Sequence, residues 1–200
     1  MKIGKLIAVD LREVWEHEAE DFTHWLSENL EPLSEAIEQP LELVEVEKKV
    51  DDSRFCIDIL AEDDSGDRVI IENQLEKTDH SHLGQIITYA TNMDAKTLIW
   101  VTKVPRQEHI NAINWLNEFS DKRFFLVQIE AYQIDNSNPA PFFSVICRPS
   151  EESKILGRSK KSLDAVRELR QRRRNASDTI IVPARKEGFE KVFLGENCWY

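Results

Sequence analysis

The first part of the chain has the apolar spacing of a helix. In residues 10–30, Trp15 and Phe22 recur on one helical face, which predicts a helix over this stretch. Asp10 precedes the first apolar position and is expected to be the N-cap. Glu18 is the one acid that falls within the apolar sector, so one carboxylate is expected to face the core side.

Three segments with a strand period follow this helix. They alternate or run apolar with many β-branched side chains, at residues 41–50, 54–62 and 68–74. The turn residues at 64–67, Asp-Ser-Gly-Asp, are typical of a hairpin. The pattern therefore predicts three consecutive antiparallel strands.

The next part of the chain alternates between the two periods. Helical spacing predicts helices at 81–93 and 107–120, and apolar runs predict strands at 97–103, 123–134 and 141–149. The order is helix, three strands, helix, strand, helix and two strands. It predicts an α/β fold in which helices flank a mixed central sheet.

The composition is that of a folded domain. Over 200 residues, 41% are hydrophobic and 32% are charged, which predicts one sizeable domain, or one domain with an appendage. No run approaches the roughly 20 apolar residues of a membrane span, and residues 1–10 lack a secretory signal. We expect no membrane partner and a cytoplasmic location. Four large aromatic residues are expected in the core: Trp100, Trp115, Phe124 and Phe125.

The three cysteines carry no pairing signal. Cys56, Cys147 and Cys198 are far apart and in no paired spacing, so we expect reduced thiols.

Charge divides the chain unevenly. The formal net charge is −11, yet residues 154–174 hold nine basic residues against two acids, a local +7 that leaves −18 for the remainder. This segment is either a solvated helix or a helix that contacts phosphates. The residues in question are Lys154, Arg158, Lys160, Lys161, Arg167, Arg170, Arg172, Arg173 and Arg174.

We expect three parts along the chain. Residues 1–150 form the main domain, 151–178 a basic helical segment or linker, and 179–200 the start of a second domain that continues beyond Tyr200.

Two acids interrupt strands that otherwise look buried. Asp58 lies in the middle strand and Glu72 near the end of the third, and a hairpin brings such positions side by side. A buried carboxylate costs several kcal/mol unless it is paired or binds a cation. A hard divalent ion such as Mg²⁺ takes oxygen ligands and would resolve this conflict.

These residues resemble the PD-(D/E)XK nuclease superfamily. Its core is an αβββαβ unit with an acid on the middle strand, an acid-x-Lys triplet on the next, and often an acid on the first helix. The matching positions are Asp58, Glu72-Asn73-Gln74 and Glu18. Gln85 and Tyr89 match the Gln-x-x-x-Tyr motif of the RecB-like branch. The layout also resembles the N-terminal nuclease-like domain of poorly characterised bacterial proteins.

The resemblance implies a restriction-endonuclease-like fold and a metal-dependent deoxyribonuclease, with a role in restriction or defence. Asp58, Glu72 and the Asn73 carbonyl would bind Mg²⁺ or Mn²⁺, and Glu18 would bind through water or hold a second ion. The triplet ends in Gln74 where the family has Lys. Glutamine can orient a water molecule but cannot supply positive charge.

The resemblance further implies that Gln85 and Tyr89 steady the metal site or the DNA backbone. DNA is the expected partner. RNA as a substrate, a homodimer and a domain after Tyr200 all remain open.

Each of these residues also has a purely structural interpretation. Asp58 and Glu72 would then be ordinary polar residues of a half-wet sheet, and Glu18 would pair with Arg12 or Lys48. Gln74 would be a strand polar residue, and Gln85 and Tyr89 a packing pair on one helix edge.

The stretch Thr-Asp-His-Ser-His at 78–82 has two interpretations. It admits a zinc site, but a helix N-cap at Thr78 or Asp79 is the simpler explanation. The chain has no HExxH, P-loop, GxGxxG or GxSxG motif, so proteases, nucleotide hydrolases and dinucleotide enzymes have no support.

Two hypotheses compete with an active nuclease. One is a catalytically silent module that keeps the fold to bind nucleic acid or a protein, which Gln74 favours. The other is an interaction domain whose acidic surface meets a basic protein, which the −18 remainder favours.

Overall fold

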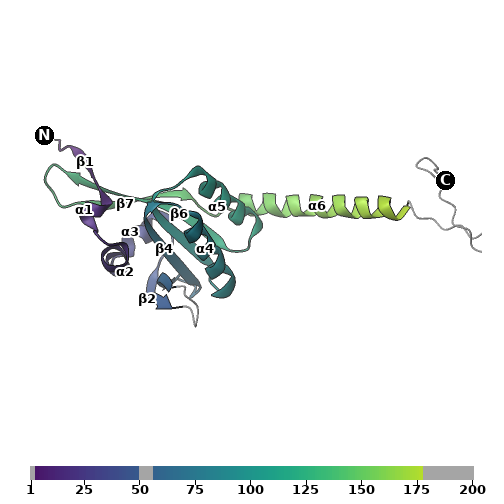
Figure 1. The fold of residues 1–200 in the computed structure, drawn as a ribbon, viewed down its shortest axis with the longest axis horizontal. Helices are drawn as coiled ribbons and strands as arrows, with labels where there is room; N and C mark the ends of the chain where they lie inside the picture. The colour runs from purple at the N-terminus through teal and green to yellow at the C-terminus, as the bar shows by residue number, and fades with distance from the viewer. Residues whose placement is uncertain (1–2, 50–55, 178–200) are drawn as a thin grey trace, which may run out of the picture. The chain divides into compact units, whose positions relative to one another are not determined.

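The computed structural model describes residues 3–49 and 56–177, and for parts of the last helix it describes only the backbone. The chain divides into two units, Met1–Lys154 and Ile155–Tyr200. The first unit contains every strand of the described sheet and is considered first (Figure 1).

A broken helical segment leads into the sheet. Strand β1 (Leu6–Val9), which the sequence did not predict, is followed by α1 (Leu11–Val14), the π-helix η1 (Glu18–Thr23), α2 (His24–Glu28) and α3 (Glu31–Ile37). Asp10 is the N-cap of α1, as expected, because its carboxylate accepts a hydrogen bond from the Arg12 amide at 2.8 Å.

The prediction of one helix over residues 10–30 is wrong. Trp15 takes an extended conformation and ends α1. Its ring is buried, with its centroid 4.9 Å from that of Phe22 and 5.0 Å from that of Trp25. A break before η1 lets three large rings pack together.

The described sheet has seven strands in a mixed arrangement. Six of them follow the order β1-β6-β5-β4-β3-β2, and β7 pairs with the other edge of β6. The strands after β1 are β2 (Glu42–Lys49), β3 (Cys56–Glu62), β4 (Arg68–Lys77), β5 (Thr97–Val104), β6 (Arg123–Ile134) and β7 (Ala140–Cys147).

Pairing directions follow the connections. Strands β2, β3 and β4 are antiparallel, as predicted, and the β3–β4 turn places Gly66 at φ 74°. The crossovers through α4 (His80–Asn92) and α5 (Gln107–Phe119) make β4, β5 and β6 parallel. From β2 to β7 the predicted order of strands and helices is therefore confirmed, as is the mixed sheet.

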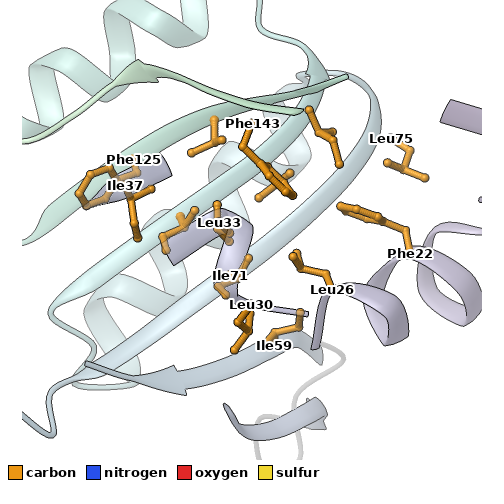
Figure 2. Packing of buried hydrophobic residues seen from close by; sticks show 14 of the residues in the cluster. Phe22, Leu26, Leu30, Leu33, Ile37, Ile59, Ile71, Leu75, Phe125 and Phe143 are labelled. Carbon is orange, nitrogen blue, oxygen red and sulfur yellow. The ribbon is translucent and has the colours of Figure 1, made fainter. Parts of the chain in front are cut away.

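Two hydrophobic cores cover the two faces of the sheet. On one face, η1, α2 and α3 contribute side chains such as Phe22 and Leu33 to the core cluster that also contains Ile71 and Phe125 (Figure 2). On the other face, α4 and α5 pack against β4, β5 and β6. Strands buried on both faces read as continuous apolar runs, which explains the sequence of β5.

Three of the four aromatic residues expected in the core lie there. Trp100, Phe124 and Phe125 are buried, but Trp115 is 58% exposed. Ile113 supplies the core contact of this part of α5, and a residue two positions further along a helix points away from that face. Trp115 packs instead on Phe119, with ring centroids 5.3 Å apart.

The second unit contains most of α6 (Glu151–Ser177), so the basic segment is helical. The expected start of a further domain at 179–200 lies outside the described residues. Within the described residues, no helix is long and apolar enough to span a membrane.

Asn117 joins α5 to the start of β6. Its side chain donates to the Phe124 carbonyl at 2.8 Å and accepts from the Phe124 amide at 2.9 Å, and it is buried. We expect Asn117→Ala to lower the free energy of unfolding by about 2–4 kcal/mol, because two buried backbone groups lose their partners. Urea denaturation measures this. Asn114→Ala, at an exposed position of the same helix, should change it by less than about 0.5 kcal/mol. Equal effects of the two substitutions would contradict this.

Candidate active site

The main-chain pairing of β3 with β4 ends just before Asp58. Main-chain pairing runs from Glu62 and Arg68 to Ile59 and Ile71 and stops there. One residue further, the Asp58 carboxylate accepts a hydrogen bond from the Asn73 amide at 2.8 Å. A side chain has thus replaced the main-chain partner that β3 would otherwise supply.

The strand alternation also breaks at this point. Ile57 lies in the same core cluster as Leu60, whereas Ile59 lies in the opposite one. Residues 57 and 59 of a regular strand would share a face, so the side chains of β3 change their packing partners around Asp58.

Glu72 lies directly beside Asp58. It is 2% exposed, and its carboxylate accepts a hydrogen bond from the Asp58 amide. Its Oε1 atom has no hydrogen-bond partner among the described residues. Asp58 and the β4 residues 72 and 73 therefore form a reciprocal clasp that holds the two carboxylates together.

Burial is the main influence on both acids. It raises the pKa of Asp58 to about 6, the Asn73 amide opposes the rise, Glu18 adds to it and His82 opposes it. Burial likewise raises the pKa of Glu72 well above its ordinary value, and the negative charges of Asp58 and Glu18 add to this. The folded protein therefore favours a proton on this pair.

Glu18 approaches the pair from η1. It is half-buried, and its Oε2 accepts a hydrogen bond from the Leu75 amide. In the purely structural interpretation, Glu18 would pair with Arg12 or Lys48. Both are engaged elsewhere, since Arg12 pairs with Glu76 at 3.1 Å and Lys48 with Glu45 at 2.7 Å.

Asn73 connects β4 to η1. Its side-chain amide donates to the Thr23 hydroxyl at 2.9 Å, and the Asn73 Oδ1 atom is buried without a partner in the described chain. The N–H and C=O of one residue point to the same side of a strand, so its carbonyl faces the gap beside Asp58.

Gln74 makes a contact that the sequence did not predict. Its amide donates to Asp79 Oδ2 at 2.8 Å, while its Oε1 atom is buried and has no partner among the described residues. Asp79 is the N-cap of α4, as one of the two expected alternatives, and accepts from the His82 amide at 2.9 Å. Thr78 instead accepts from the Arg106 amide at 2.9 Å.

Gln85 and Tyr89 tie α4 to the start of β3. The Tyr89 hydroxyl donates to the Cys56 carbonyl at 2.9 Å, and Gln85 donates to the Tyr89 oxygen. Burial raises the pKa of Tyr89, and the charges of Glu72 and Asp58 add to this, which places the phenol beside the acids. Both motif residues therefore lie next to the carboxylate pair.

Sequence reasoning missed the neighbourhood of His82. Its Nδ1 lies 2.9 Å from Asp79 Oδ1, and its charge opposes the rise in the pKa of Asp58. From the sequence, helical spacing places His82 on the same helix edge as Gln85 and Tyr89. The stretch at 78–82 was nevertheless interpreted only as a cap or a zinc site, so His82 was given no role beside the acids.

The donor chemistry of the pair fits a hard cation. Two carboxylates and the Asn73 carbonyl offer only oxygen ligands, and Glu72 keeps an oxygen without a partner. In the described part of the chain, however, no three His, Cys, Asp or Glu residues form a group that could hold a metal ion. Glu18 therefore does not complete a three-carboxylate cluster with the pair.

The candidate basic residues lie along α6. Lys160, Lys161 and Arg167 are exposed, Lys154 is half-buried, and Arg167 forms an exposed ion pair with Asp164 at 3.4 Å. The remaining candidate side chains lie outside the described part: Arg158, Arg170, Arg172, Arg173 and Arg174.

Comparison with known proteins gives two partial structural matches. One is a repair endonuclease from Pyrococcus abyssi, with a TM-score of 0.40 and 16% identity, over 50% of this chain and 44% of that one. The other is an EndoMS–dsDNA complex, with a TM-score of 0.35 and 19% identity, over 43% of this chain and 36% of that one. The match thus spans less than half of each of those chains. No protein-family model and no curated protein matches the sequence.

The raised pKa values make a prediction about stability. The folded state holds protons on Asp58 and Glu72 that the unfolded state releases from about pH 4 upward, so this pair destabilises the fold progressively as pH rises from 4 through 6 and beyond. We expect Glu72→Gln to raise the free energy of unfolding at pH 8 by a few kcal/mol and to have little effect near pH 4. Urea denaturation across this pH range measures it.

Glu76→Gln is the matched control for this test. Glu76 lies on the same strand but is exposed, so its removal should change stability by less than about 1 kcal/mol at either pH. An effect of Glu72→Gln that is the same at pH 4 and pH 8 would contradict the explanation.

Proposed function

We propose that this protein is a divalent-metal-dependent nuclease that hydrolyses phosphodiester bonds in DNA. The observation that carries the proposal is the pair formed by half-buried Asp58 and buried Glu72, held side by side by reciprocal hydrogen bonds. Among the described residues, no Lys or Arg forms an ion pair with either acid. Two adjacent carboxylates that are largely removed from water and have no Lys or Arg partner are an arrangement that a divalent cation stabilises.

Asp58, Glu72 and the Asn73 carbonyl would hold the ion. A bound Mg²⁺ or Mn²⁺ supplies a more acidic water molecule and stabilises negative charge on the phosphate. Glu18, fixed by the Leu75 amide, adds negative charge from the η1 side.

The neighbouring residues position these ligands. Gln85 and Tyr89 fix the start of β3 through the Cys56 carbonyl. Gln74 fixes the start of α4 through Asp79, and its Oε1 atom, which has no partner among the described residues, would orient the attacking water. Ligands held by such contacts need no rearrangement when the cation and substrate bind.

We further propose that α6 contacts the DNA backbone. Lys160, Lys161 and Arg167 are exposed on it, and a basic helix binds phosphates without reading sequence. A role in restriction or defence remains a prediction from the family resemblance.

One observation favours a catalytically silent module as the second candidate. The position of the family's lysine holds Gln74, and its amide is engaged by Asp79. In that case the fold would bind nucleic acid or a protein partner without cleaving it.

Nicking of supercoiled plasmid in Mg²⁺ or Mn²⁺ tests the enzyme. We expect the wild type to nick the plasmid, EDTA to abolish nicking, and Asp58→Asn and Glu72→Gln each to lower the rate by at least about 100-fold, because each removes a ligand charge. Asp64→Asn and Glu76→Gln are the controls. Both acids are exposed, Asp64 in the turn between β3 and β4 and Glu76 on β4. Nicking that the first two substitutions leave unchanged rules out this active site.

Salt dependence of DNA binding tests α6. We expect Lys160→Gln/Lys161→Gln to reduce the slope of log K against log salt by up to about 2, because each phosphate contact contributes about 0.9. Lys5→Gln/Lys122→Gln removes the same charge from the first unit and should leave the slope unchanged. Equal slopes for wild type and the α6 variant would show that these lysines do not contact DNA.

A further inference from the structure

Asp79 and His82 form a hydrogen-bonded pair at the start of α4. Asp79 Oδ1 lies 2.9 Å from His82 Nδ1 and accepts from the His82 amide at the same distance, and Gln74 donates to Oδ2 at 2.8 Å. Burial alone would raise the pKa of Asp79, but these hydrogen bonds and the charge of His82 hold it below its ordinary value. Asp79 is therefore a fixed carboxylate acceptor for the imidazole.

This contact determines how the imidazole is arranged. A carboxylate acceptor keeps the proton of a neutral ring on Nδ1, which leaves the lone pair on Nε2. The ring is also restrained by Trp100, with centroids 6.3 Å apart and planes at 12°. An aspartate that orients a histidine through Nδ1 is the arrangement that prepares Nε2 to accept a proton.

The pair lies on the side of the sheet where Glu72 lies. Gln74, which holds Asp79, follows Glu72 by two positions on β4, so both side chains face α4. Trp100, which packs on the His82 ring, is the register neighbour of Glu72 on β5. Gln74 and Glu72 each present a buried oxygen without a partner among the described residues. His82 therefore approaches the carboxylates from the helix side.

We propose that His82 is the proton acceptor for the attacking water of the nuclease, with Asp79 and Gln74 as the residues that position it. This inference rests on the proposed function. Gln74 occupies the position of the family's lysine. Its side chain is hydrogen-bonded to Asp79, which in turn contacts the imidazole of His82. In the step proposed, the water oxygen bonds to phosphorus as one water proton passes to Nε2. The P–O bond to the sugar breaks, the leaving oxygen takes a proton from solvent, and the imidazolium then returns its proton to solvent.

Five titratable groups lie around His82 and the Trp100 ring that packs on it. Asp79 lies at the helix cap, Asp58 on β3 and Glu72 on β4. His109 also packs on Trp100, with centroids 5.4 Å apart, and its ring nitrogen contacts that of His80 at 2.9 Å.

The test compares three variants of the full chain in the Mn²⁺ plasmid assay across pH 5.5–9. His82→Asn keeps a donor at the position of Nδ1 for Asp79 but has no base. His82→Ala leaves space for added imidazole. His24→Asn, at an exposed position of α2, is the control. Thermal denaturation verifies that each variant folds, and calorimetry measures Mn²⁺ binding independently of activity.

We expect His82→Asn to lower the nicking rate by about 100-fold or more and to remove the acid limb of the pH profile, with Mn²⁺ affinity within about threefold of wild type. Imidazole should restore part of the activity of His82→Ala. Nicking by His82→Asn at the wild-type rate, or an activity loss that imidazole does not restore and that leaves the pH profile unchanged, overturns this inference alone. A wild type without Asp58-dependent nicking overturns the proposed function and this inference with it.

Discussion

The candidate site depends on two like charges that the fold holds against each other inside the sheet. Asp58 takes the place of a main-chain partner for Asn73, and Glu72 accepts the amide of Asp58 in return. These two hydrogen bonds lie where the main-chain pairing of β3 with β4 ends, between two hydrophobic cores. Hydrophobic packing on both faces of β4 stabilises the strand that carries the acids, so the fold tolerates an arrangement that is unfavourable without a proton or a cation.

The helices on both faces converge on this one place. From one face, η1 reaches β4 through Glu18 at the Leu75 amide and through Thr23 at the Asn73 side chain. From the other face, α4 reaches the strands through its cap and through Tyr89. Because each contact joins a helix to the end of β3 or β4, the packing of the two layers determines the geometry of the site.

Much of this could be predicted from the sequence because it depends on local period. The alternation around Asp58 and the hairpin turn predict the antiparallel strands, and the spacing of Gln85 and Tyr89 predicts that both lie on one edge of a helix. The break at Trp15 could not be predicted, since it results from contacts between rings that the helical period does not encode. The link from Gln74 to His82 depends on where β4 ends relative to α4, which only the assembled fold determines.

A crystal of the protein soaked in Mn²⁺ and measured at the manganese absorption edge tests the central claim most directly. The account predicts one anomalous peak bonded to the carboxylates of Asp58 and Glu72 and to the Asn73 carbonyl, and no such peak in crystals of Glu72→Gln. Well-ordered wild-type side chains with no anomalous peak between them, and with the reciprocal hydrogen bonds unchanged, would contradict it.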